Sequence, residues 1–300
     1  MILSFDIGGT TIKSALGDTP DQLKPLNRQP TPASDLEAFV GAISRDVSRA
    51  PDDTIIAMSI TGVIDPETGI VTCANIPCID GLSLASVLRQ RLARPVHIVN
   101  DADCFVLAEA GFGAGRGKRV VFGAILGTGV GGGLVIDSRL HQGVGGLTGE
   151  WGHGPVAGTQ VGDPPVAIPR LKCGCGQIGC LDTVGGARGL ERLYQHLNGE
   201  FLDSQQIIAA WEAGDANAAR AVSAQIELLA GPLALVVNVV GADVVPVGGG
   251  LSRAARLVSA LDTAVRQRIL RRIDQPLVVP GIAQGEPGWI GAALFATGGA

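Results

Sequence analysis

The chain has 300 residues, of which 46% are hydrophobic and 17% are charged, so it can bury a sizeable core and does not have the composition of a disordered protein. Its formal net charge is −5 and its isoelectric point is about 5.4, which argues against a basic nucleic-acid-binding surface. The 44 glycines exceed ordinary usage and stand in short clusters, a pattern typical of tight turns and of loops whose backbone approaches a phosphate.

We expect a cytoplasmic protein with no membrane partner. The first residues, Met-Ile-Leu-Ser-Phe-Asp, have no basic segment of the kind that opens a secretory leader. The longest uncharged apolar stretch, Leu228–Ala242, is too short for a membrane span and contains Gly231, Pro232 and Asn238. This stretch therefore predicts a buried helix.

The first half of the sequence predicts alternating β and α elements. Strands are expected at Ile2–Phe5, Ile12–Leu16, Thr54–Ile60, Ile70–Cys73 and Val96–Val99, and helices at Leu36–Val47, Leu82–Leu92 and Ala102–Ala110. Ser34 or Asp35 can cap the first of these helices. The two opening strands are joined by a glycine-rich turn, which predicts a hairpin.

The second half starts with a similar strand–glycine–strand pattern. Strands are expected at Val120–Leu126, Gly133–Ile136, Val244–Val247 and Leu277–Val279, and helices at Arg188–Leu197, Ser204–Ala213, Ala216–Val240, Leu251–Leu270 and Gly288–Ala296. Residues 143–182 have the composition of a loop. Repeated β/α halves predict an α/β fold of two lobes with a ligand-binding cleft at the carboxyl ends of the strands. We expect residues 1–117, joined by a returning helix over 287–300, to form the small lobe and residues 118–286 the large one.

The turn after the first strand is a candidate phosphate loop. Its residues are Asp6, Ile7, Gly8, Gly9, Thr10 and Thr11. Two glycines expose backbone N–H groups that can approach a phosphate closely, and the preceding carboxylate suits the water shell of Mg²⁺. An ordinary hairpin with a Gly-Gly turn is an equally good interpretation of this segment alone.

Two further glycine clusters strengthen the nucleotide interpretation. Gly127, Thr128, Gly129, Val130, Gly131 and Gly132 lie between two strands, and Gly248, Gly249 and Gly250 end a third. The Thr128 hydroxyl suits a γ-phosphate, and the triple glycine suits the adenosine end of a nucleotide. No Gly-Lys-Ser/Thr follows any of these clusters, so the sequence has no Walker A loop.

Asn100 and Asp101 stand where a strand ends and a helix begins. Phosphoryl transfer to an alcohol needs a carboxylate that orients the hydroxyl and accepts its proton, and Asp101 is placed for that role. Asn100 can hold a neighbouring hydroxyl. The alternative is that Asp101 is simply the cap of the helix that starts at Ala102.

Three cysteines, Cys173, Cys175 and Cys180, crowd into eight residues. In a long chain such spacing is typical of a metal site, and three thiolates with one imidazole would close a tetrahedral structural zinc site. His153, in Gly-Glu-Trp-Gly-His, is a candidate fourth ligand; its rivals are His141, His97 and His196, of which only His141 lies in a comparable loop. A disulfide is the less favoured alternative.

These motifs together resemble the ROK family (repressors, open reading frames, kinases), in order from residue 2 to about 297. The resemblance implies an actin-like ATPase fold and a homodimeric Mg-ATP-dependent sugar 6-kinase. It implies that Asp101 is the catalytic base and that His153 joins the cysteines on zinc. The implied substrate-binding residues are Gly62, Asn75, Asn100, Asp101, Glu150, His153 and Asp182. Asp182 departs from the usual glutamate and is one methylene shorter.

Within that family the motifs look like those of bacterial N-acetylglucosamine kinases. The implied reaction is phosphorylation of N-acetyl-D-glucosamine at its 6-hydroxyl. Kinases for N-acetylmannosamine or glucose remain alternatives, as does a catalytically silent sugar sensor. A transcriptional repressor is not expected, because its helix-turn-helix would precede the first glycine turn and here a strand begins at residue 2. Lys13 and the basic residues 116–119 are expected to be solvated surface charges.

Overall fold

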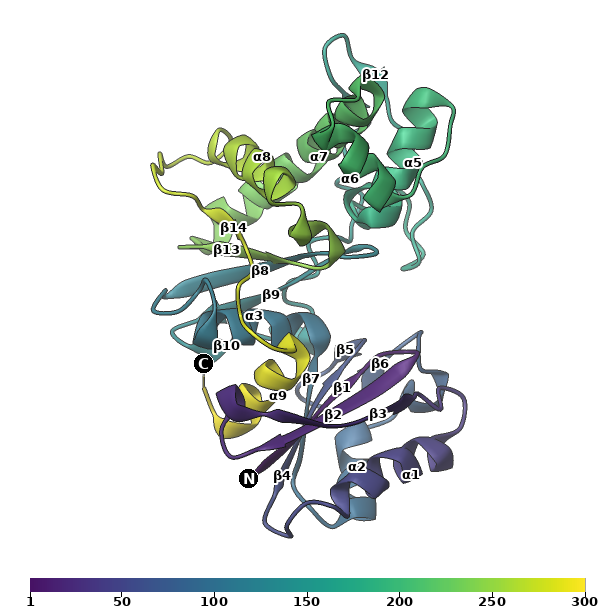
Figure 1. Cartoon of the computed structure of the whole chain (residues 1–300), viewed down its shortest axis with the longest axis vertical. Helices are drawn as coiled ribbons and strands as arrows, with labels where there is room; N and C mark the ends of the chain where they lie inside the picture. Colours follow the sequence, from purple (N-terminus) through teal and green to yellow (C-terminus); the bar gives the residue numbers. More distant parts are fainter. Residues whose placement is uncertain (300) are drawn as a thin grey trace. The chain divides into compact units, whose positions relative to one another are not determined.

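Residues 1–299 are described by the computed structural model, and they fall into two units (Figure 1). Unit 1 consists of Met1–Arg119, Gly133–Thr148 and the chain from Ile282 onward, and unit 2 consists of Val120–Gly132 and Gly149–Gly281. The sequence analysis placed residues 133–148 and 282–286 in the second lobe, whereas the structure groups them with unit 1.

Unit 1 is built on a five-stranded sheet with the order β3-β2-β1-β4-β7. The strands of this unit are β1 (Ile2–Ile7), β2 (Thr11–Gly17), β3 (Lys24–Pro30), β4 (Ile55–Ile60), β5 (Val63–Ile64), β6 (Val71–Thr72), β7 (Val96–Asn100) and β10 (Arg139–Leu140). Its helices are α1 (Leu36–Val47), α2 (Leu84–Leu92), α3 (Asp101–Phe112) and α9 (Pro287–Thr297), with 3-10 turns η1 (Pro20–Gln22), η2 (Pro77–Ile79) and η3 (Val144–Gly146).

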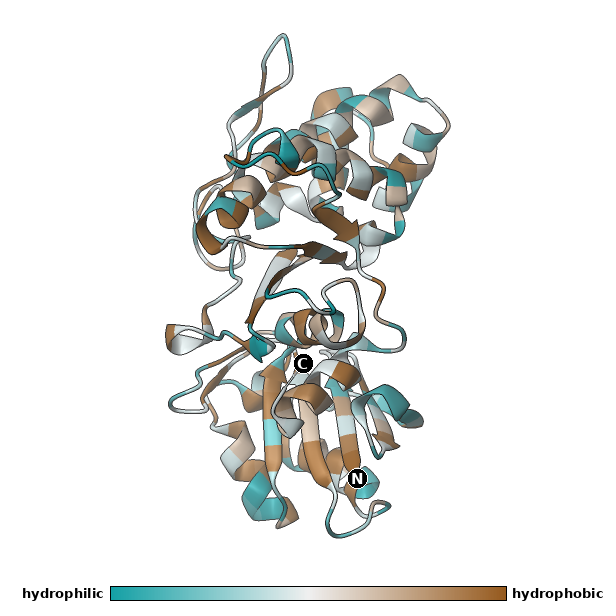
Figure 2. Cartoon of the chain, turned by 90° about the vertical axis from the view of Figure 1, so that its left-hand side faces the viewer, coloured by the Kyte–Doolittle hydropathy of each residue, from teal (hydrophilic) through white to brown (hydrophobic). Residues whose placement is uncertain are grey.

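The period of two along β1 decides which side chains face which layer. Leu3, Phe5 and Ile7 enter the larger apolar cluster, which also contains residues of α1 and α2. Ile2 joins a second, smaller cluster with residues of α3 and α9. Helices therefore cover both faces of the sheet, as Figure 1 shows, and the strands between them carry the hydrophobic colour in Figure 2. Because Phe5 and Ile7 point to the side of the sheet covered by α1 and α2, Asp6 points to the opposite side, which α9 covers.

Unit 2 contains most of the second sheet and a layer of helices. The second sheet has the order β10-β9-β8-β13-β14, of which β8 (Val120–Leu126), β13 (Val245–Gly248) and β14 (Val278–Pro280) belong to unit 2, while β9 spans Val130–Ile136. The remaining elements are β11 (Gln160–Val161), β12 (Val166–Ala167), α4 (Asp182–Gly185), α5 (Ala187–Asn198), α6 (Ser204–Glu212), α7 (Ala216–Val240), η4 (Gly250–Arg253) and α8 (Ala255–Arg266).

The apolar helix α7 is a core helix. Among the described residues it is the one helix long and apolar enough to cross a membrane, but half of its most apolar window is buried inside the protein. Asp215 caps its start by accepting a hydrogen bond from the N–H of Ala218, and Gly241 ends it in a left-handed conformation at φ 68°. The helix expected over Leu228–Ala242 forms as far as Val240, but only one face of it is buried, since Leu235 and Val239 are exposed.

One predicted helix was wrong in its extent, and the alternative interpretation of Asp101 as a helix cap does not hold. A single helix over Leu251–Leu270 does not form, because Ala254, at φ −83° and ψ 86°, separates η4 from α8. Asp101 is not the cap of α3: the helix begins at Asp101, and the side chain of Asn100 accepts hydrogen bonds from the N–H groups of Ala102 and Asp103.

Candidate functional site

The carboxyl edge of three parallel strands gathers the candidate residues of unit 1. Ile7 of β1 pairs in register with Ile60 of β4, and Ile60 pairs with Asn100 of β7. The glycine turn after Ile7, the Thr61–Gly62 segment after Ile60 and Asp101 after Asn100 therefore leave the sheet at the same edge. Ligands of α/β proteins bind at such an edge.

The first glycine turn is held by its neighbours. The N–H of Gly8 donates to the carbonyl of Thr11 at 3.0 Å, and the hydroxyl of Thr31 donates to the carbonyl of Gly8 at 2.6 Å. A Cβ on Gly9 would lie 3.0 Å from the carbonyl oxygen of Asn75. Only a residue without a side chain fits here comfortably, so the turn and the exposed Asn75 loop lie directly against each other.

Asp6 belongs to a cluster of charges that the sequence did not reveal. Lys13 Nζ lies 3.3 Å from Asp6 Oδ2 and 3.1 Å from Glu286 Oε1. Burial raises the pKa of Asp6, while the Lys13 ammonium opposes that rise. Partial burial lowers the pKa of Lys13, but the carboxylates of Glu286 and Asp6 have the opposite effect and together raise it. The expectation that Lys13 is a solvated surface charge was wrong.

Asp6 also lies against the first turn of α9. A Cβ on Gly288 would be 2.6 Å from Asp6 Oδ1. The N-terminal end of a helix favours a nearby negative charge, so this placement supports an ionised Asp6. In the same stretch, the hydroxyl of Ser4 donates to the carbonyl of Trp289 at 2.8 Å.

Asn100 fixes the start of α3 and leaves Asp101 at the surface. Its Oδ1 accepts from the N–H of Ala102 at 2.7 Å, and its Nδ2 donates to the carbonyl of Gly62 at 2.6 Å. Gly62 needs to be glycine, with φ 117° and the carbonyl of Thr72 only 2.6 Å from where a Cβ would stand. Asp101 is exposed, and its Oδ1 accepts from the N–H of Ala102 at 2.9 Å.

In unit 2, two glycine segments meet at the edge of β8 and β13. Gly248 pairs in parallel register with Ile125, so both strands end together. Gly249 has φ 84°, and a Cβ there would lie 2.5 Å from the carbonyl group of Leu126. The turn at Gly127 is thus packed directly against Gly249.

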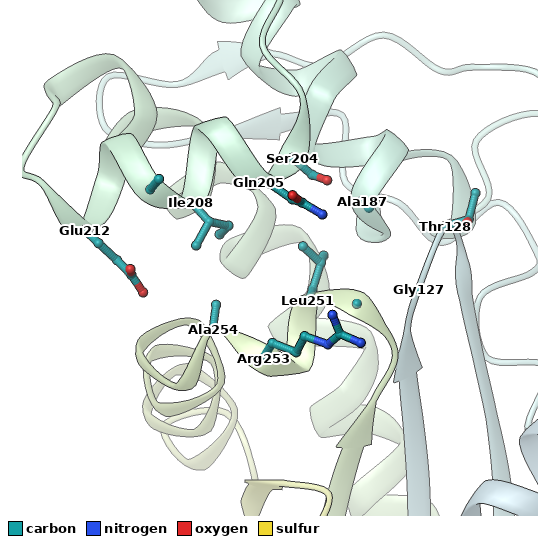
Figure 3. Close-up of a pocket in the computed structure, with 12 residues that line it drawn as sticks. Gly127, Thr128, Ala187, Ser204, Gln205, Ile208, Glu212, Leu251, Arg253 and Ala254 are labelled. Atoms are coloured by element: carbon teal, nitrogen blue, oxygen red, sulfur yellow. The ribbon is translucent and has the colours of Figure 1, made fainter. Parts of the chain in front are cut away.

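A cavity of about 710 Å³ opens beside this junction, entirely within unit 2. It is lined by Gly127, Thr128, Ala187, Ser204, Gln205, Ile208, Ala209, Glu212, Gly250, Leu251, Arg253 and Ala254. Figure 3 shows Gln205 and Ile208 of α6 across the cavity from Leu251 and Arg253 of η4. Its mixture of apolar and polar walls is typical of small-ligand sites. The contributions of α6 and Arg253 were missed, since no local pattern marks them.

The four side chains expected to bind zinc lie together in unit 2. The ligand atoms of His153, Cys173, Cys175 and Cys180 all lie within 4.8 Å of one another. Cys175 and Cys180 are separated by 3.6 Å between their sulfurs, and Cys173 Sγ lies 3.7 Å from His153 Nδ1. Zinc–sulfur bonds of about 2.3 Å imply a tetrahedron edge of about 3.8 Å. The donor set and its spacing therefore fit zinc.

The thiols differ in how easily they ionise, and the imidazole turns one nitrogen toward them. Burial raises the pKa of Cys173 to about 12, and the backbone N–H of Gln177 lowers the pKa of Cys175 to about 7. A bound divalent cation favours the thiolate of both. His153 turns Nδ1 to the cysteines, while its Nε2 lies 3.5 Å from Glu150 Oε2. Burial raises the pKa of Glu150, and His153 opposes that rise.

Asp182 is held by the second glycine turn. Its Oδ1 accepts from the N–H of Val130 at 2.8 Å, and its own N–H donates to the carbonyl of Gly152 at 2.8 Å. Gly131, in the same turn, accepts through its carbonyl from Trp151 Nε1 at 2.7 Å. The turn is thus fastened to the segment that carries His153.

The sequence-predicted residues therefore form two groups, one in each unit. The residues in unit 1 are Asp6, Gly8, Gly9, Thr10, Thr11, Gly62, Asn75, Asn100 and Asp101, and those in unit 2 are Gly127, Thr128, Gly129, Gly131, Glu150, His153, Cys173, Cys175, Cys180, Asp182, Gly248, Gly249 and Gly250. Lys13, Glu286 and Gly288 of unit 1 were missed. Glu286 and Lys13 are 273 residues apart in the sequence, which no local pattern can detect.

The chain is similar to known proteins along nearly its whole length. The sequence model of the ROK family matches residues 2–298. The N-acetyl-D-glucosamine kinase of Citrobacter koseri is 36% identical over 302 residues, with 98% of each chain covered, and that of Escherichia fergusonii matches equally well.

Solved structures agree. The ROK hexokinase of Thermus thermophilus superposes with a TM-score of 0.81 at 28% identity, covering 99% of this chain and 97% of that one. The ROK family glucokinase of Streptomyces griseus, in complex with glucose and AMPPNP, superposes with a TM-score of 0.78 at 26% identity and 99% coverage of both chains. The expected fold class, the actin-like ATPase fold of ROK kinases, is confirmed.

Proposed function

The chain belongs to the ROK family, and from that premise we propose that it transfers the γ-phosphate of ATP to the 6-hydroxyl of N-acetyl-D-glucosamine. The similarity to N-acetyl-D-glucosamine kinases over 98% of the chain supports this substrate more than glucose or N-acetylmannosamine. The observation that carries the mechanism is the exposed carboxylate of Asp101, on the same strand edge as the first glycine turn.

In unit 1, Asp101 orients the 6-hydroxyl and accepts its proton as the oxygen attacks phosphorus. One amide N–H of its neighbour Asn100 donates to the carbonyl of Gly62, and the second N–H of that amide can donate to a sugar hydroxyl. Gly62 and Asn75 complete the sugar contacts of this unit. Asn75 lies against Gly9, so the sugar-binding loop and the phosphate turn support each other.

Asp6 and the N–H groups of Gly8, Gly9, Thr10 and Thr11 are the proposed phosphate and magnesium contacts of unit 1. The Mg²⁺ ion supplies charge neutralisation on the phosphates when ATP is bound. Asp6 suits its water shell because Lys13 and the first turn of α9 favour an ionised carboxylate there.

In unit 2, the cavity of about 710 Å³ is the proposed adenosine site. Gly127, Thr128, Gly129 and Gly131 would receive the phosphates, and Gly248, Gly249 and Gly250 the nucleoside. Ile208 and Leu251 offer apolar contact to a base, and Glu212 and Arg253 offer polar contact. The cavity is large enough for such a ligand.

The cysteine cluster is the proposed structural zinc site, with all four positions filled by His153, Cys173, Cys175 and Cys180. Glu150 and His153 are the proposed sugar contacts of unit 2. A His153 ring that ligates zinc through Nδ1 carries its proton on Nε2, which can donate to Glu150 or to a sugar oxygen. Asp182, which the family resemblance also assigns to the sugar, contacts the second glycine turn through the N–H of Val130.

We also propose a cytoplasmic homodimer. None of the six cysteines, all within the described residues, forms a disulfide, as expected in a reducing compartment. Leu235 and Val239 on the outer face of α7 are 63% and 75% exposed, and Leu270 is 96% exposed. The N–H of Leu270 donates to Asn238 Oδ1 at 3.0 Å, so the three lie on one surface that a second copy could cover. Sedimentation velocity tests this.

The deciding experiment is ADP release by purified protein with Mg-ATP and N-acetylglucosamine, N-acetylmannosamine or glucose. We expect the highest kcat/KM with N-acetylglucosamine. A higher kcat/KM with another sugar would support the kinase mechanism but contradict the proposed substrate. If folded protein released no ADP with any of these sugars, the kinase function would be refuted and a sugar sensor would be the remaining interpretation.

The role of Asp101 is tested by Asp101→Asn. We expect kcat to fall by 10²-fold or more, on the order of the contribution of a general base, with sugar binding largely retained. Asp163→Asn, an exposed aspartate in a loop, is the matched control. Near-normal kcat in Asp101→Asn would refute the assignment.

A further inference from the structure

A buried carboxylate stands near the end of α3, in unit 1. Glu109 is 1% exposed and belongs to the helix that starts with Asp101. Within residues 1–299, no lysine, arginine or histidine forms an ion pair with it. A carboxylate withdrawn from water needs hydrogen-bond donors in its place. The burial of Glu109 therefore depends on the N–H groups that it accepts from.

Two backbone segments far apart in the chain supply those donors. The N–H of Ala114, just after α3, donates to Glu109 Oε2 at 2.8 Å, and the N–H of Ala283, which precedes α9, donates to Oε1 at 2.8 Å. Gly113 permits this arrangement, because a Cβ there would collide with Glu109 Oε2. One carboxylate thus joins the end of α3 to the segment that leads into α9.

Residues 282–286, which form that segment, are exposed or half-buried throughout. Burial alone therefore does not fix their position. Two side chains of unit 1 hold them: Glu109 accepts from the N–H of Ala283, and Lys13 pairs with Glu286 at 3.1 Å. The loss of either contact is expected to loosen the segment.

The segment ends against Asp6. Gly288, in the first turn of α9, has its Cβ position 2.6 Å from Asp6 Oδ1, and Lys13 lies 3.3 Å from Asp6 Oδ2. Glu286 stands directly before that turn and shares Lys13 with Asp6. A displacement of residues 282–286 is therefore expected to change the surroundings of Asp6.

The helix α3 is anchored independently of this segment. Asn100 caps its first turn, and its residues from Ala102 to Glu109 are all buried. Loss of the hydrogen bonds of Glu109 should therefore leave Asp101 in place. The consequences should fall on Asp6 and not on the base.

We propose that Glu109 is a positioning residue for the nucleotide: it fixes Ala283, and with it the segment before α9, so that Asp6 is correctly placed for the Mg²⁺ of the bound nucleotide. This inference rests on the proposed function in taking Asp6 as the magnesium contact. It gives a residue outside both glycine turns a part in binding Mg-ADP and no part in binding the sugar.

The test measures binding without turnover, by calorimetry, as the Kd of ADP with Mg²⁺, the Kd of ADP in magnesium-free buffer and the Kd of N-acetylglucosamine. Glu109→Met keeps the length of the side chain and removes both acceptor oxygens. It should raise the Kd of ADP with Mg²⁺ about tenfold, the effect of about one lost hydrogen bond. The other two constants should stay within about twofold of wild type. A purely structural role would shift all three together.

Glu109→Gln is the milder variant, because its amide keeps one acceptor oxygen, and we expect a smaller rise from it. Asp262→Leu is the matched control in unit 2. Asp262 is 5% exposed, and its Oδ1 accepts from the N–H groups of Leu277 and Val278 at 2.8 and 2.9 Å. Its removal should lower the urea midpoint as the Glu109 variants do and leave every Kd unchanged.

Hydrogen exchange of the peptide covering residues 282–286, followed by mass spectrometry, is a second measurement that needs neither ligand nor turnover. We expect faster exchange of this peptide in both Glu109 variants than in wild type. In the double variant with Asp6→Ala, Glu109→Met should raise the Kd of ADP with Mg²⁺ no further.

An unchanged Kd of ADP with Mg²⁺ in folded Glu109→Met and Glu109→Gln would overturn the inference. So would an equal rise in magnesium-free buffer, or full additivity with Asp6→Ala. The proposed function fails separately, through absence of ADP release by the wild type with any sugar, and that result does not alter these binding constants.

Discussion

Gly288 offers a test of Asp6 that leaves Asp6 itself in place. A Cβ added at Gly288 would stand 2.6 Å from Asp6 Oδ1 and 2.9 Å from its Cγ. Ordinary carbon–oxygen contact needs about 3.4 Å, so in Gly288→Ala the carboxylate must move by roughly 0.8 Å. Lys13, 3.3 Å away on the other side of that carboxylate, restricts where it can go.

A misplacement of about 1 Å can cost 10²-fold in rate, so we expect Gly288→Ala to lower kcat/KM for Mg-ATP by one to two orders of magnitude. Stability should change by less than about 1 kcal/mol, because alanine is the better helix former. The assay is ADP release over a range of Mg²⁺ concentrations, with thermal unfolding measured in parallel.

Gly231→Ala is the matched control. Gly231 lies in α7, and a Cβ there would meet nothing within 4 Å, so this variant should keep wild-type kinetics. The double variant with Asp6→Ala completes a cycle: Gly288→Ala should add no further loss once Asp6 is gone. Wild-type kcat/KM in Gly288→Ala, or full additivity with Asp6→Ala, would refute the reasoning.

Two further predictions concern charges in unit 1. Lys13→Met leaves Asp6 and Glu286 facing each other without their shared cation, so the free energy of unfolding should fall by about 1 kcal/mol. Adding Glu286→Gln should recover part of that loss in urea titrations; no recovery would refute the pairing. Burial and the nearby Arg89 cation lower the pKa of His97, so the folded state disfavours its protonation. Stability should therefore drop as pH falls below about 6.5, and His97→Gln should show a smaller drop. Equal slopes for both proteins would contradict this.

Elements with strong local signals were predicted well. The helices α1 and α7 have the bounds expected from the sequence, Leu36–Val47 and Ala216–Val240, and each has an aspartate cap that accepts an N–H bond. The cysteine cluster was also foreseeable, because three thiols within eight residues need little folding to meet. In these cases the determining contacts lie within a few residues.

Where long-range contacts decide, the sequence was uninformative. The strand β3 was missed because Lys24–Pro30 is polar and contains Pro25 and Pro30, which an edge strand tolerates. The interruption between η4 and α8 falls at Ala254, a residue type that does not indicate a helix end in the sequence. The ion pair of Lys13 with Glu286 could not be predicted from the sequence, because the two residues are far apart in the chain and meet only in the folded protein.

The dependence of β1 on α9 has a consequence for synthesis. Lys13 finds Glu286 only 273 residues later, and the partner of Ser4 is 285 residues away. At roughly 5–20 residues per second, the ribosome needs on the order of 15–60 s between making the first glycine turn and making the helix that braces it. During that interval the nascent chain can form the local strands around Asp6, with Lys13 beside its carboxylate, but it lacks Glu286 and the first turn of α9. A chain interrupted before α9 would accordingly carry every motif of the phosphate turn and still lack the surroundings that hold Asp6 in position.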